Sequence, residues 1–124
     1  MSYTVLAVDD DAMLLWMLAT LIEQDPRLGL FGTAGDGREA VERVRQGCPD
    51  SIVCDMRMPV MDGLEALPLL RRACPACVIV VYSSEPGAAG DALRVGADEV
   101  VDKAGDPTAL LDLIVDLCAA RSQG

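Results

Sequence analysis

Five short apolar runs, each followed by a segment of helical length, constrain the fold of this chain most strongly. The runs have the length and composition of strands and cover residues 4–8, 28–33, 51–55, 78–83 and 99–102. The helical segments cover residues 12–23, 38–46, 63–73, 87–95 and 107 to about 120. Short loops join them, so consecutive strands are expected to run parallel. The central runs are apolar throughout, as in a sheet covered on both sides. We therefore predict an α/β fold, with helices on both faces of a five-stranded parallel sheet.

Length and charge narrow the class of protein. The 124 residues suit one domain, residues 1–124, and 52% are apolar, which is enough for one core. The net charge is −10, which disfavours direct contact with nucleic acid or with an anionic membrane surface. No apolar run reaches the roughly 18 residues needed to span a bilayer. The composition favours a cytoplasmic domain whose partners are neither nucleic acids nor membranes.

The cysteines predict a reducing compartment. There are five, Cys48, Cys54, Cys74, Cys77 and Cys118, an odd number that indicates reduced thiols. Cys74-Pro75-Ala76-Cys77 forms a C-x-x-C, which suits a redox pair or half of a zinc site. The chain has no histidine and no second C-x-x-C, and this pair precedes a strand. We therefore interpret the pair as small core or surface thiols.

Polar residues at the carboxyl ends of the predicted strands indicate a functional site. Strand ends carry Asp9-Asp10, Asp55, Ser83 and Lys103. Ligands of open parallel sheets bind at this edge. Carboxylates about 4 Å apart repel by roughly 4 kcal/mol at an effective dielectric of 20, so such clusters share a proton or a metal. Oxygen ligands next to a phosphate favour Mg²⁺. Asp55 is then a candidate nucleophile that forms an aspartyl phosphate, with Lys103 and Ser83 contacting the phosphoryl oxygens.

These motifs resemble a known family. VDDD at 8–11, DMRMPVMDG at 55–63, Ser83-Ser84 and GADEVVDK at 96–103 are similar to the receiver domain of two-component response regulators. The resemblance covers essentially the whole chain and implies a flavodoxin-like, doubly wound sheet of order 2-1-3-4-5. GTAGDGREAVERV and DMRMPVMDGLEAL are most similar to receivers that precede a helix-turn-helix output domain, which implies a link to transcription regulation.

The resemblance also implies roles for the site residues. Asp55 would accept the phosphoryl group, and Ser83 and Lys103 would contact it. Asp55 and Asp10 would bind Mg²⁺ directly, and Asp9 directly or through water. The backbone carbonyl of Arg57 would complete the set, and Mn²⁺ could substitute.

Three more positions lie close to this set in the sequence motifs. Arg57 and Glu85 stand where receivers tune dephosphorylation. Asp11 matches no required ligand and is interpreted as a helix cap.

Three positions depart from the family pattern. Ala104 replaces the usual proline after the lysine, which predicts a looser hold on Lys103. Val100 replaces a Tyr or Phe, which removes a rotamer switch of that type. Pro68 lies inside the third predicted helix and lacks a backbone donor, so a kink or a late start is expected there. None of these changes removes a group that the chemistry needs.

The first helix has apolar residues on two sides. A helical wheel places five of them on an inward face, Leu14, Met17, Leu18, Leu21 and Ile22. Trp16 falls nearly opposite, with Leu15 and Ala19 beside it, where an amphipathic helix is normally polar. We predict a docking surface for a partner protein or for homodimerisation.

The favoured function is a phospho-acceptor switch that receives its phosphoryl group from a histidine kinase or phosphotransfer protein. Such a domain is not an enzyme beyond its own phosphorylation and dephosphorylation. One alternative is a degenerate receiver that serves as a phosphorylation-independent scaffold. Another is a small phosphatase with an aspartate nucleophile, for which Asp9-x-Asp11 is a formal match.

Overall fold

The structure is a computed structural model that describes residues 2–85, 87 and 89–123. Residue 88 of the predicted helix 87–95 lies outside the described residues. None of the described helices is long and apolar enough to cross a membrane.

Strands and helices alternate along the chain as the apolar runs predict. The strands are β1 (Tyr3–Val8), β2 (Leu28–Ala34), β3 (Ser51–Cys54), β4 (Val78–Ser83) and β5 (Glu99–Asp102). The helices are α1 (Ala12–Gln24), α2 (Gly37–Arg45), α3 (Gly63–Ala73), α4 (Ala89–Arg94) and α5 (Pro107–Gln123). The strands form one parallel sheet of order β2-β1-β3-β4-β5, which confirms the flavodoxin-like topology.

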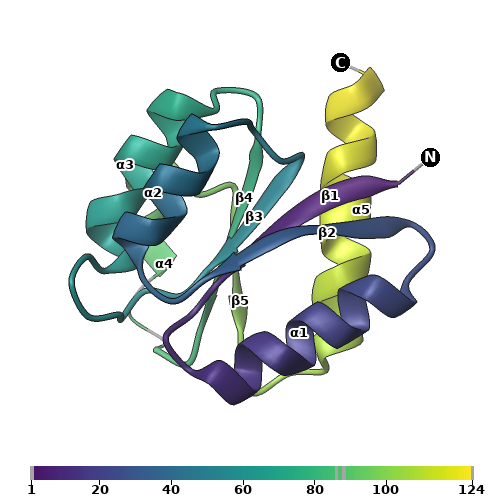
Figure 1. Ribbon diagram of the computed structural model, residues 1–124, viewed down its shortest axis with the longest axis horizontal. Coiled ribbons are helices and arrows are strands. Elements are labelled where there is room, and N and C mark those ends of the chain that lie inside the picture. The colour runs from purple at the N-terminus through teal and green to yellow at the C-terminus, as the bar shows by residue number, and fades with distance from the viewer. Residues whose placement is uncertain (1, 86, 88, 124) are drawn as a thin grey trace.

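The sheet lies between two helical layers (Figure 1). Helices α2, α3 and α4 cover one face, and α1 and α5 cover the other. Alternate side chains of each strand enter the two cores. In β1, Leu6 and Val8 pack toward the α2–α3 side, whereas Val5 and Ala7 pack toward the α1–α5 side. The central strands β3 and β4 are buried throughout, which explains their continuous apolar sequence.

Two helices differ in detail from the prediction. Helix α4 is short, Ala89–Arg94, and among its described residues only Ala92 is buried. Helix α3 begins at Gly63, without delay, and continues through Pro68 to Ala73. Pro68 is exposed, and its missing N–H removes one helical hydrogen bond on the solvent side. The packing of buried neighbours such as Leu67 and Leu70 offsets this loss.

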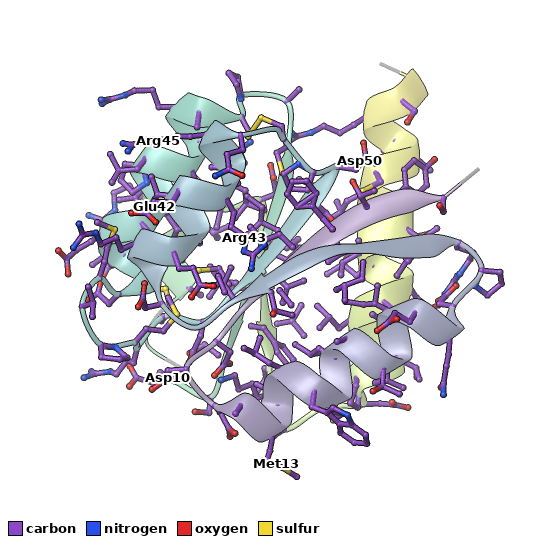
Figure 2. The ribbon with its side chains drawn as sticks, viewed as in Figure 1. Asp10, Met13, Glu42, Arg43, Arg45 and Asp50 are labelled. Atoms are coloured by element: carbon purple, nitrogen blue, oxygen red, sulfur yellow. A yellow bond between two sulfur atoms is a disulfide. The ribbon has the colours of Figure 1, made fainter. Side chains whose placement is uncertain are left out.

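The prediction of five reduced cysteines is wrong for two of them. Cys48 and Cys74 form a disulfide between the segment after α2 and the end of α3, seen as a yellow bond in Figure 2. Cys54, Cys77 and Cys118 are free and buried. The partner of Cys74 is therefore not Cys77, although C-x-x-C spacing drew attention to that pair. The helix pair α2–α3 brings Cys48 to Cys74 across 26 residues, a proximity that spacing along the chain does not reveal.

Candidate functional site

The ends of three strands bring the predicted acids and the lysine together. Val8 of β1 pairs with Cys54 of β3, so the next residues, Asp9 and Asp55, leave neighbouring strands at the same level. On the other side, β4 ends opposite the end of β5, with Ser83 paired to Asp102. The amide of Lys103 then donates to the carbonyl of Ser83 at 3.0 Å.

Lys103 links the two buried carboxylates. Its Nζ lies 2.7 Å from Oδ2 of Asp9 and 3.3 Å from Oδ2 of Asp55. Asp9 is only 2% exposed, and its other oxygen accepts the amide of Asp11 at 2.9 Å. Burial opposes the charge on Lys103, but its hydrogen bond with Asp9 and the nearby negative charges outweigh that effect and raise its pKa. The lysine is therefore a firmly charged group at the centre of the site.

Asp55 sits in a less favourable environment. The residue is 8% exposed, and one of its oxygens accepts the amide of Met56 at 2.8 Å. Burial raises the pKa of Asp55, and the charge of Asp9 raises it further, against the opposing effect of Lys103. The Met56 amide is a contact that sequence analysis missed, because a backbone donor leaves no signal in residue type. It orients the carboxylate and leaves its second oxygen toward Lys103.

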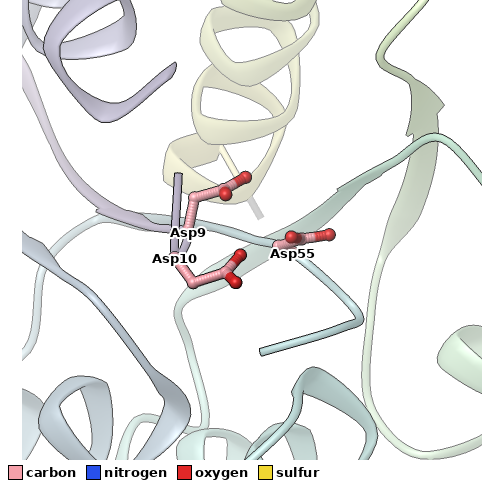
Figure 3. A group of neighbouring side chains, drawn as sticks. All are labelled: Asp9, Asp10 and Asp55. Carbon is pink, nitrogen blue, oxygen red and sulfur yellow. The ribbon is translucent and has the colours of Figure 1, made fainter. Parts of the chain in front are cut away.

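Asp10 completes an acidic cluster that could hold a metal. One carboxylate oxygen from each of Asp9, Asp10 and Asp55 lies within 4.8 Å of the others, as Figure 3 shows for the side chains. Asp10 is exposed, and it has no hydrogen bond or ion pair with the residues that the structure describes. An all-oxygen set suits a hard divalent cation such as Mg²⁺. A cavity of about 740 Å³ opens beside Asp10 and Met56, so the cluster can be reached from solvent.

Ser83 is joined by a hydrogen bond to Glu85, one of the two predicted modulators that line the same cavity. Ser83 is buried, and its hydroxyl oxygen accepts the amide of Glu85 at 3.1 Å. Its hydroxyl hydrogen can still be donated to a new acceptor. The side chains of Arg57 and Glu85 form an ion pair, and both residues line the cavity. The sequence predicts a role for each of these two residues but not their ion pair.

Asp11 has the structural role that the sequence predicts. It is the N-cap of α1, and its carboxylate accepts the amides of Met13 and Leu14. The phosphatase alternative requires Asp9 as nucleophile and Asp11 as its partner. Both oxygens of Asp9 already accept hydrogen bonds, and Asp11 caps a helix, so the geometry does not support that alternative.

The family departures leave Lys103 in place. The peptide bond between Lys103 and Ala104 is trans, as are all peptide bonds among the described residues. The amide of Ala104 donates to the Asp102 carboxylate at 2.8 Å, so an Asp-centred turn replaces the missing proline. Val100 is half-buried against the α2–α3 core.

The exposed apolar face of α1 differs from the predicted surface at Leu15, Ala19 and Met13. Trp16 is 66% exposed, as the helical wheel predicts. Leu15 and Ala19 are only partly exposed, and Leu15 packs against the α1–α5 core. Met13 is 74% exposed and extends away from the start of α1 in Figure 2. Met13 is exposed because the first turn of a helix has few neighbours to bury it, an effect that a helical wheel does not represent.

Comparison with known proteins places the chain in a family. The profile of the response regulator receiver domain matches residues 5–115. The protein-glutamate methylesterase/protein-glutamine glutaminase of Maricaulis maris is 40% identical over 103 residues, which are 80% of this chain. The chain spans only 26% of the length of that relative.

Solved structures agree with this family. The response regulator domain of Thermotoga maritima CheB has a TM-score of 0.87 at 33% identity, over 96% of this chain and 98% of that one. The CheX-CheY-BeF3-Mg complex from Borrelia burgdorferi matches with a TM-score of 0.83 at 26% identity, over 93% of this chain and 88% of that one. These matches confirm the resemblance that the sequence motifs indicate.

Proposed function

The chain belongs to the family of response regulator receiver domains and is a phospho-accepting signalling switch, and from that premise we propose that Asp55 is its phosphoacceptor. The observation that carries the proposal is the position of Lys103, whose ammonium contacts both Asp9 and Asp55 beside the exposed Asp10. This arrangement offers a nucleophilic oxygen, a fixed cation and an open carboxylate close together, with the carboxylate of Asp10 lining the cavity.

The transfer forms one bond and breaks one. The Asp55 carboxylate attacks the phosphorus of a phosphohistidine on a histidine kinase or phosphotransfer protein. An O–P bond forms, the N–P bond breaks, and the leaving imidazole retains the electron pair and takes a proton from solvent. Lys103 lies 3.3 Å from Asp55 and can contact a phosphoryl oxygen after a small movement away from Asp9. Ser83 can donate its hydroxyl hydrogen to another phosphoryl oxygen.

Asp10, Asp55, the Arg57 carbonyl and, directly or through water, Asp9 would hold Mg²⁺, for which Mn²⁺ can substitute. The all-oxygen donor set fits such an ion. The likeness to a receiver solved with BeF3 and Mg supports the same assignment. When bound, the cation would neutralise charge that develops on the transferring group. The use of both Asp9 oxygens in hydrogen bonds favours contact through water for that residue.

The new charge on Asp55 would bias the domain toward a second surface state. The Arg57–Glu85 ion pair lies beside the cavity and would tune hydrolysis of the aspartyl phosphate by limiting the approach of water. Trp16 with Leu15 and Ala19, joined by Met13, would form the surface that meets the phosphodonor or a second copy of the chain. Such a switch would work in the cytoplasm, a compartment that the three free thiols fit and in which the Cys48–Cys74 disulfide would be open to reduction.

The chain itself would carry the switch and not an output activity. Its catalysis would be limited to its own phosphorylation and hydrolysis, although the Maricaulis relative, of which the chain spans only 26%, is a methylesterase/glutaminase. The likeness of GTAGDGREAVERV and DMRMPVMDGLEAL to receivers that precede a helix-turn-helix domain favours transcription regulation as the output that this switch would control. Hydrolysis of a protein glutamate methyl ester by this chain alone would contradict the proposal.

The central test is incubation with Mg²⁺ and acetyl phosphate, followed by intact-protein mass spectrometry. The wild-type chain is expected to gain one phosphoryl group, and Asp55→Asn is expected to gain none. Asp36→Asn is the matched control, because Asp36 caps α2 and asparagine caps a helix equally well. Absence of any mass increase in the wild type, while a control receiver is phosphorylated, would favour the scaffold alternative.

A further inference from the structure

The first turn of α2 touches the loop that follows Asp55. We call residues 56–62 the acceptor loop. The amide of Gly37, at the start of α2, donates to the carbonyl of Met61 at 2.9 Å. A Cβ at position 37 would lie 2.5 Å from that carbonyl oxygen and 2.9 Å from the Cβ of Ala66. Only glycine lets the two backbones approach this closely.

The acceptor loop contains a strained turn at the point of this contact. Val60 has a φ of 68°, a left-handed conformation that a β-branched residue adopts rarely. The amide of Met61 donates to the carbonyl of Pro59 at 2.7 Å, which closes a γ-turn around Val60. The side chain of Val60 is 73% exposed, so its packing does not hold this conformation. The hydrogen bond from the Gly37 amide to the carbonyl of Met61, the residue after Val60, restrains this turn from outside the loop.

The other end of the acceptor loop is bound directly to the site. The amide of Met56 donates to the Asp55 carboxylate at 2.8 Å, and the carbonyl of Met56 accepts the amide of Gly63 at 2.9 Å. Between these fixed points lies Arg57, whose carbonyl is the proposed metal ligand. The acceptor loop is thus fixed at Met56 by Gly63 and at Met61 by α2.

We propose that Gly37 is a positioning residue for the phosphoacceptor site and acts through the strained turn at Val60. By fixing Met61, helix α2 sets the path of the acceptor loop, and with it the Arg57 carbonyl and the Met56 amide. Metal affinity and phosphoryl uptake then depend on a residue that touches no reacting atom. The inference rests on the proposed function of Asp55.

The test compares three variants with the wild type. Gly37→Ala places a methyl group against Met61 and is expected to weaken Mg²⁺ binding, measured by calorimetry, by about 10- to 100-fold. Gly47→Ala is the matched control, because a Cβ at position 47 meets nothing within 4 Å. Its Mg²⁺ affinity and its rate of phosphorylation by acetyl phosphate should equal those of the wild type.

Val60→Gly separates positioning from a merely structural role. Glycine removes the left-handed strain, so the melting temperature of metal-free protein should rise. It also lets the turn leave its geometry, so Mg²⁺ affinity should fall by about tenfold or more. A purely structural role predicts that a more stable variant binds Mg²⁺ at least as well. Val60→Gly therefore tests the positioning role even where Gly37→Ala does not fold.

The outcomes distinguish the inference from the function it rests on. A wild type that binds Mg²⁺ and takes up the phosphoryl group, with Gly37→Ala and Val60→Gly indistinguishable from it, overturns the positioning role alone. A wild type that does neither overturns both. Weakened Mg²⁺ binding in Val60→Gly together with a higher melting temperature supports the positioning role.

Discussion

Reduction of the Cys48–Cys74 disulfide is expected to destabilise the folded chain by about 3.5 kcal/mol. The bond joins residues 26 apart, and closure of a loop of that length removes conformational entropy from the unfolded chain. An unfolding entropy of about 2.1 cal/mol/K per residue converts this loss into a fall of roughly 13 °C in melting temperature for the whole chain. Strain or residual structure in the unfolded chain would make the measured value smaller.

Thermal unfolding with and without a dithiol reductant measures this effect, and thiol titration of the denatured chain identifies the bond. The non-reduced chain should show three reactive thiols, those of Cys54, Cys77 and Cys118. Burial raises the pKa of Cys77 to about 12, so in the folded chain it should stay protonated and not exchange into the bond. Cys48→Ser is the control, because the reductant should leave its melting temperature unchanged.

Two results would refute this reasoning. Five reactive thiols in protein that has met no reductant would mean that the two cysteines are not bonded. Three thiols with a melting temperature that the reductant leaves unchanged would mean that the loop closure contributes nothing to stability.

Three further perturbations test the site and its surroundings. The pKa of Asp55 is raised in the folded state, so the neutral carboxyl group stabilises the fold at low pH, and this stabilisation is lost as pH rises through that pKa. Asp55→Asn should therefore stabilise the metal-free protein at pH 7, which denaturant titration measures. Arg57→Ala should change the unfolding free energy by less than about 0.5 kcal/mol, since its ion pair with Glu85 is largely exposed, but should speed loss of the phosphoryl group from labelled protein. Trp16→Ala should leave stability within about 0.5 kcal/mol and slow transfer from a phosphohistidine donor; an unchanged transfer rate and an unchanged oligomeric state would remove the docking surface from the proposal.

Apolar runs and their boundaries were sufficient to predict the alternation of strands and helices. Each strand buries its own side chains in a pattern that depends on local sequence, as the continuous burial of β3 and β4 illustrates. The end of α4 was less predictable, because only Ala92 of its described residues is fixed by core packing. The disulfide was not predictable, because it depends on how α2 lies against α3 and not on either sequence alone.

The site divides in the same way. Asp9, Asp10, Asp55, Ser83 and Lys103 end strands, and the parallel sheet brings strand ends to one edge, so the sequence was enough to group them. Contacts made by backbone amides carry no residue signature. The Met56 amide on Asp55 and the Gly37 amide on Met61 are of this kind, and they became visible only in three dimensions.

Charge balance shows what a bound metal would add to Lys103 at this site. Three ionised carboxylates and one ammonium group leave a net charge of two negative units, which one divalent cation would neutralise. The Lys103–Asp55 contact at 3.3 Å is worth at most about 5 kcal/mol at an effective dielectric of 20, before desolvation is subtracted. Lys103 also lies 2.7 Å from Asp9, so its positive charge is shared between two carboxylates and offsets the charge of Asp55 only in part. Phosphorylation would replace the single negative charge of the Asp55 carboxylate with up to about two on the phosphoryl group, a net gain of about one. That added charge would draw Lys103 from Asp9 and give the Ser83 hydroxyl a new acceptor. The negative charge of Asp9, which adds to burial in raising the pKa of Asp55, would therefore also favour the change of state.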